Sequence, residues 1–220
     1  MVARPPLCSD NAFSFSLEYQ GLGAQDKCAF ISSALRHHHA SMVVILEPKK
    51  EVGWMSFFSN NIGGPQYLHA ATCNKHIWVF WRQDLDVQLV DATSQCLTTK
   101  MLVGGIEFLF TFVYPSFEEV ERKDLWHHLE MFQVGTNPWF VGGDFNSIAD
   151  ISEKIGGVGS SNSGTQDFRN FMATLGLMDL GFVGNKYTWC SNRKGMNRIG
   201  VILIVVSLIF RVWILLGQLQ

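Results

Sequence analysis

Short apolar runs separated by turn residues recur along the chain and predict buried strands. The runs are Met42–Leu46, Ile77–Trp81, Val87–Val90, Phe108–Val113 and Pro138–Gly143. Met42–Leu46 and Pro138–Gly143 have the continuous apolar sequence of buried strands, and the other runs look like further strands. Because these runs alternate with segments of helical spacing, the pattern predicts an α/β fold with crossover connections.

Apolar residues at helical spacing predict three helices. Ser116 followed by Glu119 is a capping-box pattern that marks the start of one helix. Its apolar face would comprise Leu125, Trp126, Leu129 and Phe132. A second helix is expected from near Thr165 to Gly176, with Phe168, Phe171, Met172 and Leu175 on one face. A third is expected from Asp26 to Arg36.

Composition narrows the class of protein. The chain has 220 residues, of which 47% are hydrophobic and 16% charged, and this excludes an intrinsically disordered protein. The formal net charge of -2 means that any nucleic-acid contact must use a local basic patch. Five scattered cysteines without a CxxC pair suit a reducing compartment, and no apolar run follows the first residues. We expect an intracellular protein, nuclear or cytoplasmic, rather than a secreted one.

The segment from Ile199 to Gly217 is almost entirely apolar, with Arg211 as its single charge. It is long enough to span a bilayer, but an arginine near the centre of such a helix costs about 2.5–3.5 kcal/mol. Its many Val and Ile residues fit a strand or an aggregation-prone segment equally well. These alternatives stay open, with a membrane span the less favoured.

Histidines and basic residues offer weaker candidates for chemistry. The run His37–His39 is a poor chelate because adjacent side chains on a helix diverge, and His127 and His128 have no partner four residues away, so we expect all five at the surface. Between Asn185 and Arg198 the chain carries basic residues interleaved with aromatic ones, including Lys186, Arg193 and Trp189. Such a pattern suits either a solvated hairpin or a contact with DNA, and both interpretations stay open on the pattern alone.

Two carboxylates follow apolar strands. Glu47 comes directly after Met42–Leu46, and Asp144 directly after Pro138–Gly143, with Asn146 close behind. Strand ends of α/β proteins are where binding sites form, and two carboxylates can share a hard cation such as Mg²⁺. Acids that merely end their strands are the alternative.

Several motifs in a fixed order give a resemblance to a known family. They are LEPK at 46–49, VYP at 113–115, GGDFNSI at 142–148, EKIGG at 153–157 and GLMDLGFVGNKYTWCSNR at 176–193. Together they resemble the endonuclease/exonuclease/phosphatase superfamily, and within it the endonuclease domains of plant non-LTR (LINE-like) retrotransposons. The resemblance implies a two-sheet α/β sandwich, C-terminally incomplete here, over residues 16–198. Residues 1–15 would be an N-terminal extension and 199–220 a divergent tail.

The resemblance also implies residue roles. Glu47 would ligate Mg²⁺ or Mn²⁺, Tyr114 would contact the scissile phosphate, Asp144 would orient or deprotonate the attacking water, and Asn146 would hold the phosphate or the aspartate. Thr188, with Trp189, Lys186 and Arg193, would support substrate binding. The reaction implied is metal-assisted hydrolysis of a DNA phosphodiester, for a reverse transcriptase normally encoded in the same polyprotein.

Two departures from the family pattern accompany the resemblance. Glu18, in LEYQGLG at 17–23, stands where the family has an asparagine, so it would be an atypical metal ligand. The family's Arg-Leu-Asp-Arg and terminal Ser-Asp-His segments have no counterpart after Arg198. We therefore expect an impaired or inactive endonuclease. The alternative is a non-catalytic retroelement remnant that binds at most nucleic acid or protein.

Overall fold

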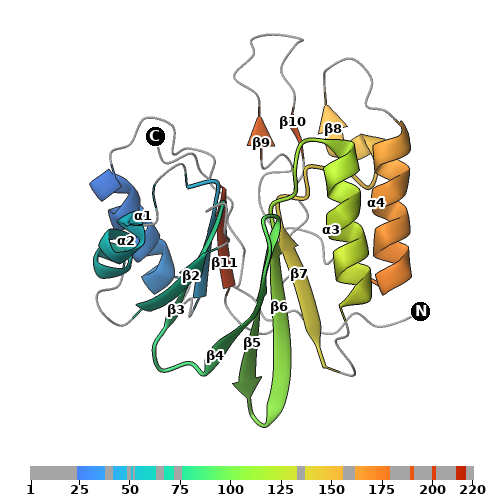
Figure 1. Ribbon diagram of the computed structural model, residues 1–220. Helices are drawn as coiled ribbons and strands as arrows, with labels where there is room; N and C mark the ends of the chain where they lie inside the picture. Colours follow the sequence, from blue (N-terminus) through green and yellow to red (C-terminus); the bar gives the residue numbers. More distant parts are fainter. Residues whose placement is uncertain are drawn as a thin grey trace, which may run out of the picture.

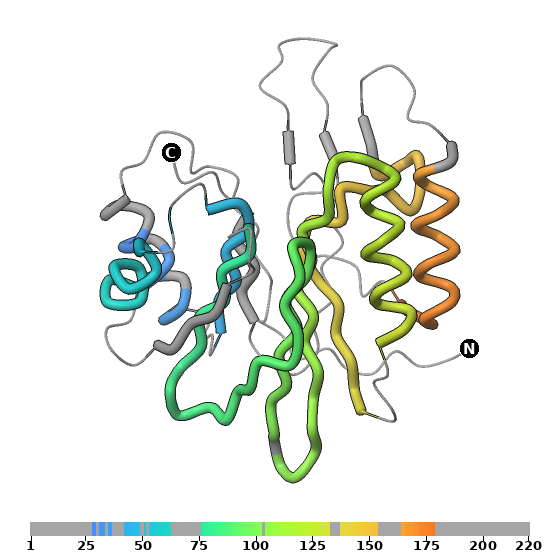
Figure 2. The backbone as a smooth tube through the Cα atoms, viewed as in Figure 1, coloured from blue at the N-terminus to red at the C-terminus, as the bar shows by residue number. Residues whose placement is uncertain are grey.

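The computed structural model describes residues 24–37, 42–48, 51, 53–62, 67–71, 76–132, 137–155, 162–178, 189–190, 200–201 and 212–216 (Figures 1 and 2). Two four-stranded sheets face each other, and helices cover the outer face of each (Figure 1). The two-sheet α/β sandwich predicted from the sequence is thereby confirmed.

The first sheet has the strand order β11-β1-β3-β2 and carries helices α1 and α2 on its outer face. Its elements are α1 (Ala24–His37), β1 (Met42–Leu46), α2 (Trp54–Ile62), β2 (Tyr67–Ala71), β3 (Ile77–Arg82) and β11 (Val212–Leu216). Strand β1 is central and pairs antiparallel with β3 and parallel with β11.

The second sheet has the order β4-β5-β6-β7 and carries α3 and α4. Its elements are β4 (Val87–Ala92), β5 (Cys96–Val103), β6 (Ile106–Val113), α3 (Glu119–Met131), β7 (Trp139–Gly143) and α4 (Asn162–Leu175). A short 3₁₀ helix (Ile151–Glu153) and a small sheet of β8 (Lys154–Ile155), β10 (Gly200–Val201) and β9 (Trp189–Cys190) complete the described elements.

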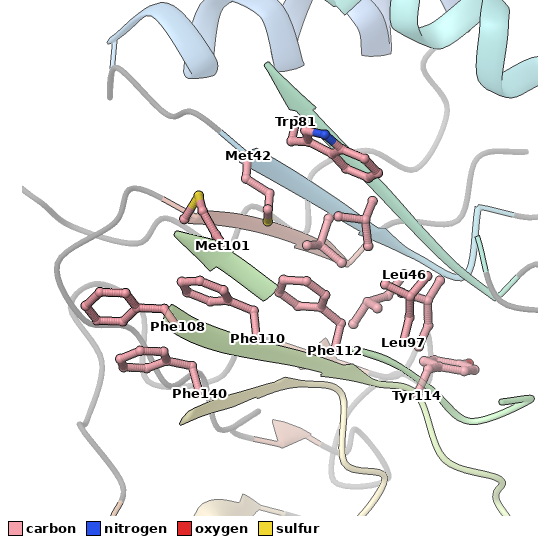
Figure 3. Packing of buried hydrophobic residues seen from close by; sticks show 13 residues of the cluster. Met42, Leu46, Trp81, Leu97, Met101, Phe108, Phe110, Phe112, Tyr114 and Phe140 are labelled. Carbon is pink, nitrogen blue, oxygen red and sulfur yellow. The ribbon is translucent and has the colours of Figure 1, made fainter. Parts of the chain in front are cut away.

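Three apolar layers hold the sandwich together. In β1, Val43 and Ile45 face α1 and α2, whereas Met42, Val44 and Leu46 face the second sheet. Both faces of this strand are therefore covered, and this is why its sequence is apolar throughout instead of alternating. Between the sheets lie mostly aromatic residues of β6 and β7, including Phe108, Phe110, Phe112 and Phe140 (Figure 3).

The second sheet positions its strand ends through one hairpin and one crossover. Gly104 and Gly105, both with positive φ, form the tight turn between β5 and β6. Helix α3 then returns the chain so that β7 pairs parallel with β6, with Val113 opposite Gly143. Residues that follow β6 and β7 consequently emerge at the same end of the sheet, at the top in Figure 1.

The predicted helices are present, with corrections to the bounds of all three, since α1 begins at Ala24 and ends at His37 instead of spanning Asp26–Arg36. Helix α3 begins at Glu119, and its N-cap is Glu118 without a side-chain cap. The predicted capping box at Ser116 is therefore wrong, because the Ser116 hydroxyl instead accepts a hydrogen bond from the Glu118 N–H in the preceding turn. Helix α4 begins at Asn162, three residues before the predicted start near Thr165, and ends as predicted at Gly176, whose φ of 63° suits glycine.

Part of the apolar segment 199–217 is a strand. Residues Val212–Leu216 form β11, which adds to β1 with Met42 opposite Val212. Among the described residues, no helix combines the length and apolar character needed to cross a membrane. The division into a domain at 16–198 and a tail at 199–220 stays a prediction.

Candidate functional site at the sheet rim

Three strands of the two facing sheets end beside one another and deliver acidic and phenolic side chains. Glu47 follows β1, Tyr114 follows β6 and Asp144 follows β7. The Glu47 carboxylate accepts a hydrogen bond from the Tyr114 hydroxyl, and the charges of Glu47 and Asp144 both act on that phenol. The structure thus brings together three of the residues singled out in the sequence. We call Glu47, Tyr114, Asp144 and Asn146 the rim site.

Tyr114 lies at the centre of the rim site and is only 6% exposed. Burial, followed by the negative charges of Glu47 and Asp144, raises the pKa of its phenol well above the usual range. The phenol therefore stays protonated and can donate a hydrogen bond. The ring of His76 packs edge-on against Tyr114 at 5.4 Å between centroids, and the Glu47 N–H donates to the His76 carbonyl at 2.7 Å.

Asp144 has a strongly perturbed carboxyl group. Burial raises its pKa to about 6, and the Glu47 charge adds to the rise. The Asn146 N–H, 2.9 Å from Asp144 Oδ1, opposes it by stabilising the ionised form. A carboxyl with a pKa this near neutrality is mostly ionised at pH 7 and can still take up a proton, as a general base must.

Asn146 joins the two loops that leave the second sheet. Its Nδ2 donates a hydrogen bond to the Pro115 carbonyl at 2.7 Å, so the loop after β7 is tied to the loop after β6. Its backbone N–H binds Asp144 in the same turn. Asn146 thereby fixes the separation between Asp144 and Tyr114.

Backbone strain is concentrated in the rim site. Among the described residues, Glu47 and Asn146 are the non-glycine residues with positive φ, at 51° and 46°. Such a conformation costs about 1–3 kcal/mol and persists where the surroundings impose it, which is often at functional sites. Gly143 shows a further constraint, since its φ is 147° and an added Cβ would lie 2.0 Å from the Val113 carbonyl oxygen. Only glycine lets β6 and β7 approach closely at this point.

Gln95, which the sequence analysis did not single out, fastens the Tyr114 loop. Its backbone carbonyl accepts from the Tyr114 N–H at 2.9 Å, its Oε1 accepts from the Ser116 N–H at 2.8 Å, and its Nε2 donates to the Glu121 carbonyl at 2.9 Å. No local motif marks such a glutamine, because its partners follow it by about twenty residues or more. The exposed ring of Phe117 packs edge-on against Tyr114 at 6.4 Å and was also missed.

The remaining residues named from the sequence fall outside this geometry. Glu18, Lys186, Thr188 and Arg193 lie outside the described residues, as do His38 and His39. Trp189 is described only as the first residue of β9. Of the pair in α3, His127 is exposed as expected. His128 is partly exposed, and its Nε2 also lies 2.8 Å from Asp91 Oδ2 on strand β4, a partner that the sequence did not indicate.

The donors of the rim site suit a hard divalent cation. The two carboxylates of Glu47 and Asp144 supply oxygen ligands, the kind that Mg²⁺ and Mn²⁺ prefer. The Glu47 charge raises the pKa of both Tyr114 and Asp144, and the Asp144 charge adds to the rise at Tyr114. A bound cation would relieve this repulsion, so the residues present fit such an ion.

Comparison with known proteins places the fold. No protein-family model and no curated protein matches the chain. Among solved structures, the endonuclease domain of TRAS1, a telomere-specific non-LTR retrotransposon, has a TM-score of 0.53 at 17% identity, covering 81% of this chain and 77% of that chain. A β-hairpin deletion mutant of beta toxin from Staphylococcus aureus has a TM-score of 0.56 at 11% identity, covering 91% and 87%. The fold is thus the endonuclease/exonuclease/phosphatase sandwich, and these likenesses show the fold alone.

Proposed function

We propose that this chain is a divalent-metal-dependent phosphodiester hydrolase of the endonuclease/exonuclease/phosphatase family, and that it acts on DNA as a retrotransposon endonuclease does. The observation that carries the proposal is the convergence of Glu47, Tyr114 and Asp144, with a pKa of about 6 for Asp144. The motif order along the sequence and the likeness of the fold to the TRAS1 endonuclease domain support the substrate class.

Each residue of the rim site has a role in this proposal. Glu47 holds Mg²⁺ or Mn²⁺, with Glu18 as an atypical additional ligand, and the ion neutralises charge on the phosphoryl oxygens when bound. Asp144 accepts the proton of the attacking water, for which its pKa is suited. Asn146 holds Asp144 in place, and the Tyr114 hydroxyl donates a hydrogen bond to a phosphate oxygen.

The DNA partner would meet the rim site through aromatic and basic side chains. Phe117 is 72% exposed next to Tyr114, and an exposed ring beside a phosphate site can stack on an unpaired base. Lys186, Thr188, Trp189 and Arg193 would add phosphate and base contacts. We place the activity inside the cell, with a reverse transcriptase as the partner enzyme in the retroelement.

Turnover should be slow compared with that of a family member that has the asparagine at position 18. A carboxylate at position 18, where the family has an asparagine, would repel the substrate phosphate. The remaining rim residues still provide the base and a cation site. We therefore expect this chain to hydrolyse DNA weakly but measurably.

Nicking of supercoiled plasmid DNA with millimolar Mg²⁺ or Mn²⁺ tests the proposal. Asp144→Asn keeps the shape of the side chain and removes the base, so nicking should fall by about 10²–10⁴-fold. Asp150→Asn is the matched control, because Asp150 is an exposed acid that pairs with Arg169 and is not one of the rim-site residues. Equal nicking by the wild type and Asp144→Asn would contradict hydrolysis at this site and favour a binding role instead.

A further inference from the structure

A second group of metal-ligating side chains lies away from the rim, between the second sheet and helix α3. Asp91 of β4, Cys96 at the start of β5 and His128 of α3 place one oxygen, one sulfur and one nitrogen within 4.8 Å of one another. Asp91 Oδ2 lies 2.8 Å from His128 Nε2 and 3.9 Å from Cys96 Sγ. We call these residues the Asp91–Cys96–His128 cluster.

A β-bulge aims Asp91 into this cluster. In the β4–β5 pairing Leu89 lies opposite Thr99, but the register then shifts and Asp91 lies opposite Thr98. Without the shift Asp91 would lie opposite Leu97, whose side chain belongs to the layer between the sheets. The bulge instead turns the carboxylate to the face of Cys96, which packs with residues of α3. Bulges recur where a side chain must be redirected.

The spacing of the three atoms is close to a tetrahedral zinc site. With Zn–N and Zn–O bonds of about 2.0–2.2 Å and Zn–S bonds of about 2.3 Å, adjacent ligand atoms lie about 3.4–3.6 Å apart. The two separations given above bracket this value, so side-chain shifts of about half an ångström would suffice for them. A thiolate, an imidazole and a carboxylate are ligands that zinc accepts, whereas Mg²⁺ disfavours the first two.

The cluster is reachable from solvent on one side. The side chains of His128 and Asp91 are 38% and 27% exposed, while Cys96 is fully buried behind them. The Thr93 hydroxyl lies 3.3 Å from Cys96 Sγ and accepts from the Cys96 N–H, which fixes the turn that carries the thiol. A metal ion could therefore enter past the two exposed ligands, with water as a fourth ligand.

We propose that Asp91, Cys96 and His128 form a Zn²⁺ site that joins the β4–β5 strand pair to helix α3. On binding, the Cys96 thiol loses its proton to solvent and its sulfur bonds to the metal, while neutral His128 binds through Nε2 and Asp91 through Oδ2. The ion replaces the direct contact between Asp91 and His128. This site is independent of the rim site and of the activity proposed for it.

Cobalt substitution of the full-length chain provides the test. After treatment with a chelator, titration with Co²⁺ should produce a sulfur-to-cobalt charge-transfer band and the visible absorption of a tetrahedral ion, and Zn²⁺ should abolish both. Cys96→Ser should remove the charge-transfer band. Cys28→Ser is the matched control, because Cys28 is also buried but packs between α1 and the first sheet.

A second variant keeps the proposal testable if Cys96→Ser does not fold. His128→Gln should weaken Co²⁺ binding by at least about tenfold, while His127→Gln, one residue earlier and exposed, should leave it unchanged. Asp144→Asn should leave the sulfur-to-cobalt band unchanged, which separates this site from the rim. Lack of a thiolate band in the wild type, or a band that survives in Cys96→Ser, would overturn the proposal.

Discussion

The rim site and the Asp91–Cys96–His128 cluster hold their charges in opposite ways. At the rim, burial and the neighbouring Glu47 both disfavour the ionised form of Asp144, and the pKa rises to about 6. In the other cluster, Asp91 has His128 at 2.8 Å as a partner of potentially opposite charge. Added negative charge at the rim therefore raises the pKa of its neighbours, which a cation would offset, whereas in the metal-free cluster the Asp91 carboxylate lies against an imidazole. For the stability of the rim site, we therefore expect a bound cation to matter more than contacts with other side chains.

The close packing of β6 against β7 brings the strand ends of the rim site together. Gly143 is the position where a substitution should disturb this packing most. Gly143→Ala would place a Cβ 2.0 Å from the Val113 carbonyl oxygen at a φ of 147°. Because the backbone of β6 must move, we expect the free energy of unfolding to fall by about 4 kcal/mol or more. Urea denaturation followed by circular dichroism measures this loss.

The control for that variant is Gly53→Ala. An added Cβ at Gly53 would meet nothing within 4 Å, so the free energy of unfolding should change by no more than about 0.5 kcal/mol. Similar losses in the two variants would show that the β6–β7 contact does not constrain position 143.

The next largest effect on the free energy of unfolding comes from the raised pKa of Asp144, and this effect depends on pH. In the unfolded chain the carboxyl ionises near 3.8, but in the folded chain only near 6, so ionisation penalises the folded state as the pH rises through this interval. Asp144→Asn removes the penalty. In metal-free buffer its advantage in free energy of unfolding over the wild type should grow between about pH 4 and pH 6 and then level off, at the order of 3 kcal/mol.

Chemical denaturation of both proteins across this pH range, with a chelator present, makes the measurement. Added Mn²⁺ or Mg²⁺ should reduce the advantage of Asp144→Asn, because the ion stabilises the ionised wild type by mass action. An advantage that is constant with pH would mean that Asp144 is not desolvated as described.

The smallest effect belongs to the Asp91–Cys96–His128 cluster without metal. His128→Gln breaks a contact between two partly exposed side chains, and such pairs contribute no more than about 1 kcal/mol. Thermal unfolding in chelator, with His127→Gln as the reference, should detect a loss within that limit. A larger loss would indicate that the cluster is itself a strained or highly desolvated charge pair, which would remove the contrast with the rim.

The two regions also differ in how far the sequence predicted them. Glu47 and Asp144 could be predicted because each ends an apolar run, and position at a strand end needs only local pattern. His128 could not, because its partner precedes it by 37 residues and faces it only through a register shift in β4. Strand β5 was missed because its polar Thr98, Thr99 and Lys100 interrupt the apolar pattern, although Gly104–Gly105 offered a hairpin signal. Thr98 and Thr111 instead satisfy each other across β5 and β6.

Gln95 connects the rim site and the Asp91–Cys96–His128 cluster, so local unfolding around this residue affects both regions. It directly precedes Cys96, and through its carbonyl and side chain it holds the amides of Tyr114 and Ser116. Exchange of those two amide hydrogens with solvent requires Gln95 to release them, so their protection reports on the turn between β4 and β5. Anything that stiffens this turn will slow the fluctuations of the loop that presents the Tyr114 phenol. Through its backbone carbonyl and its uncharged side chain, this one residue couples opening of the Tyr114 loop to the turn between β4 and β5.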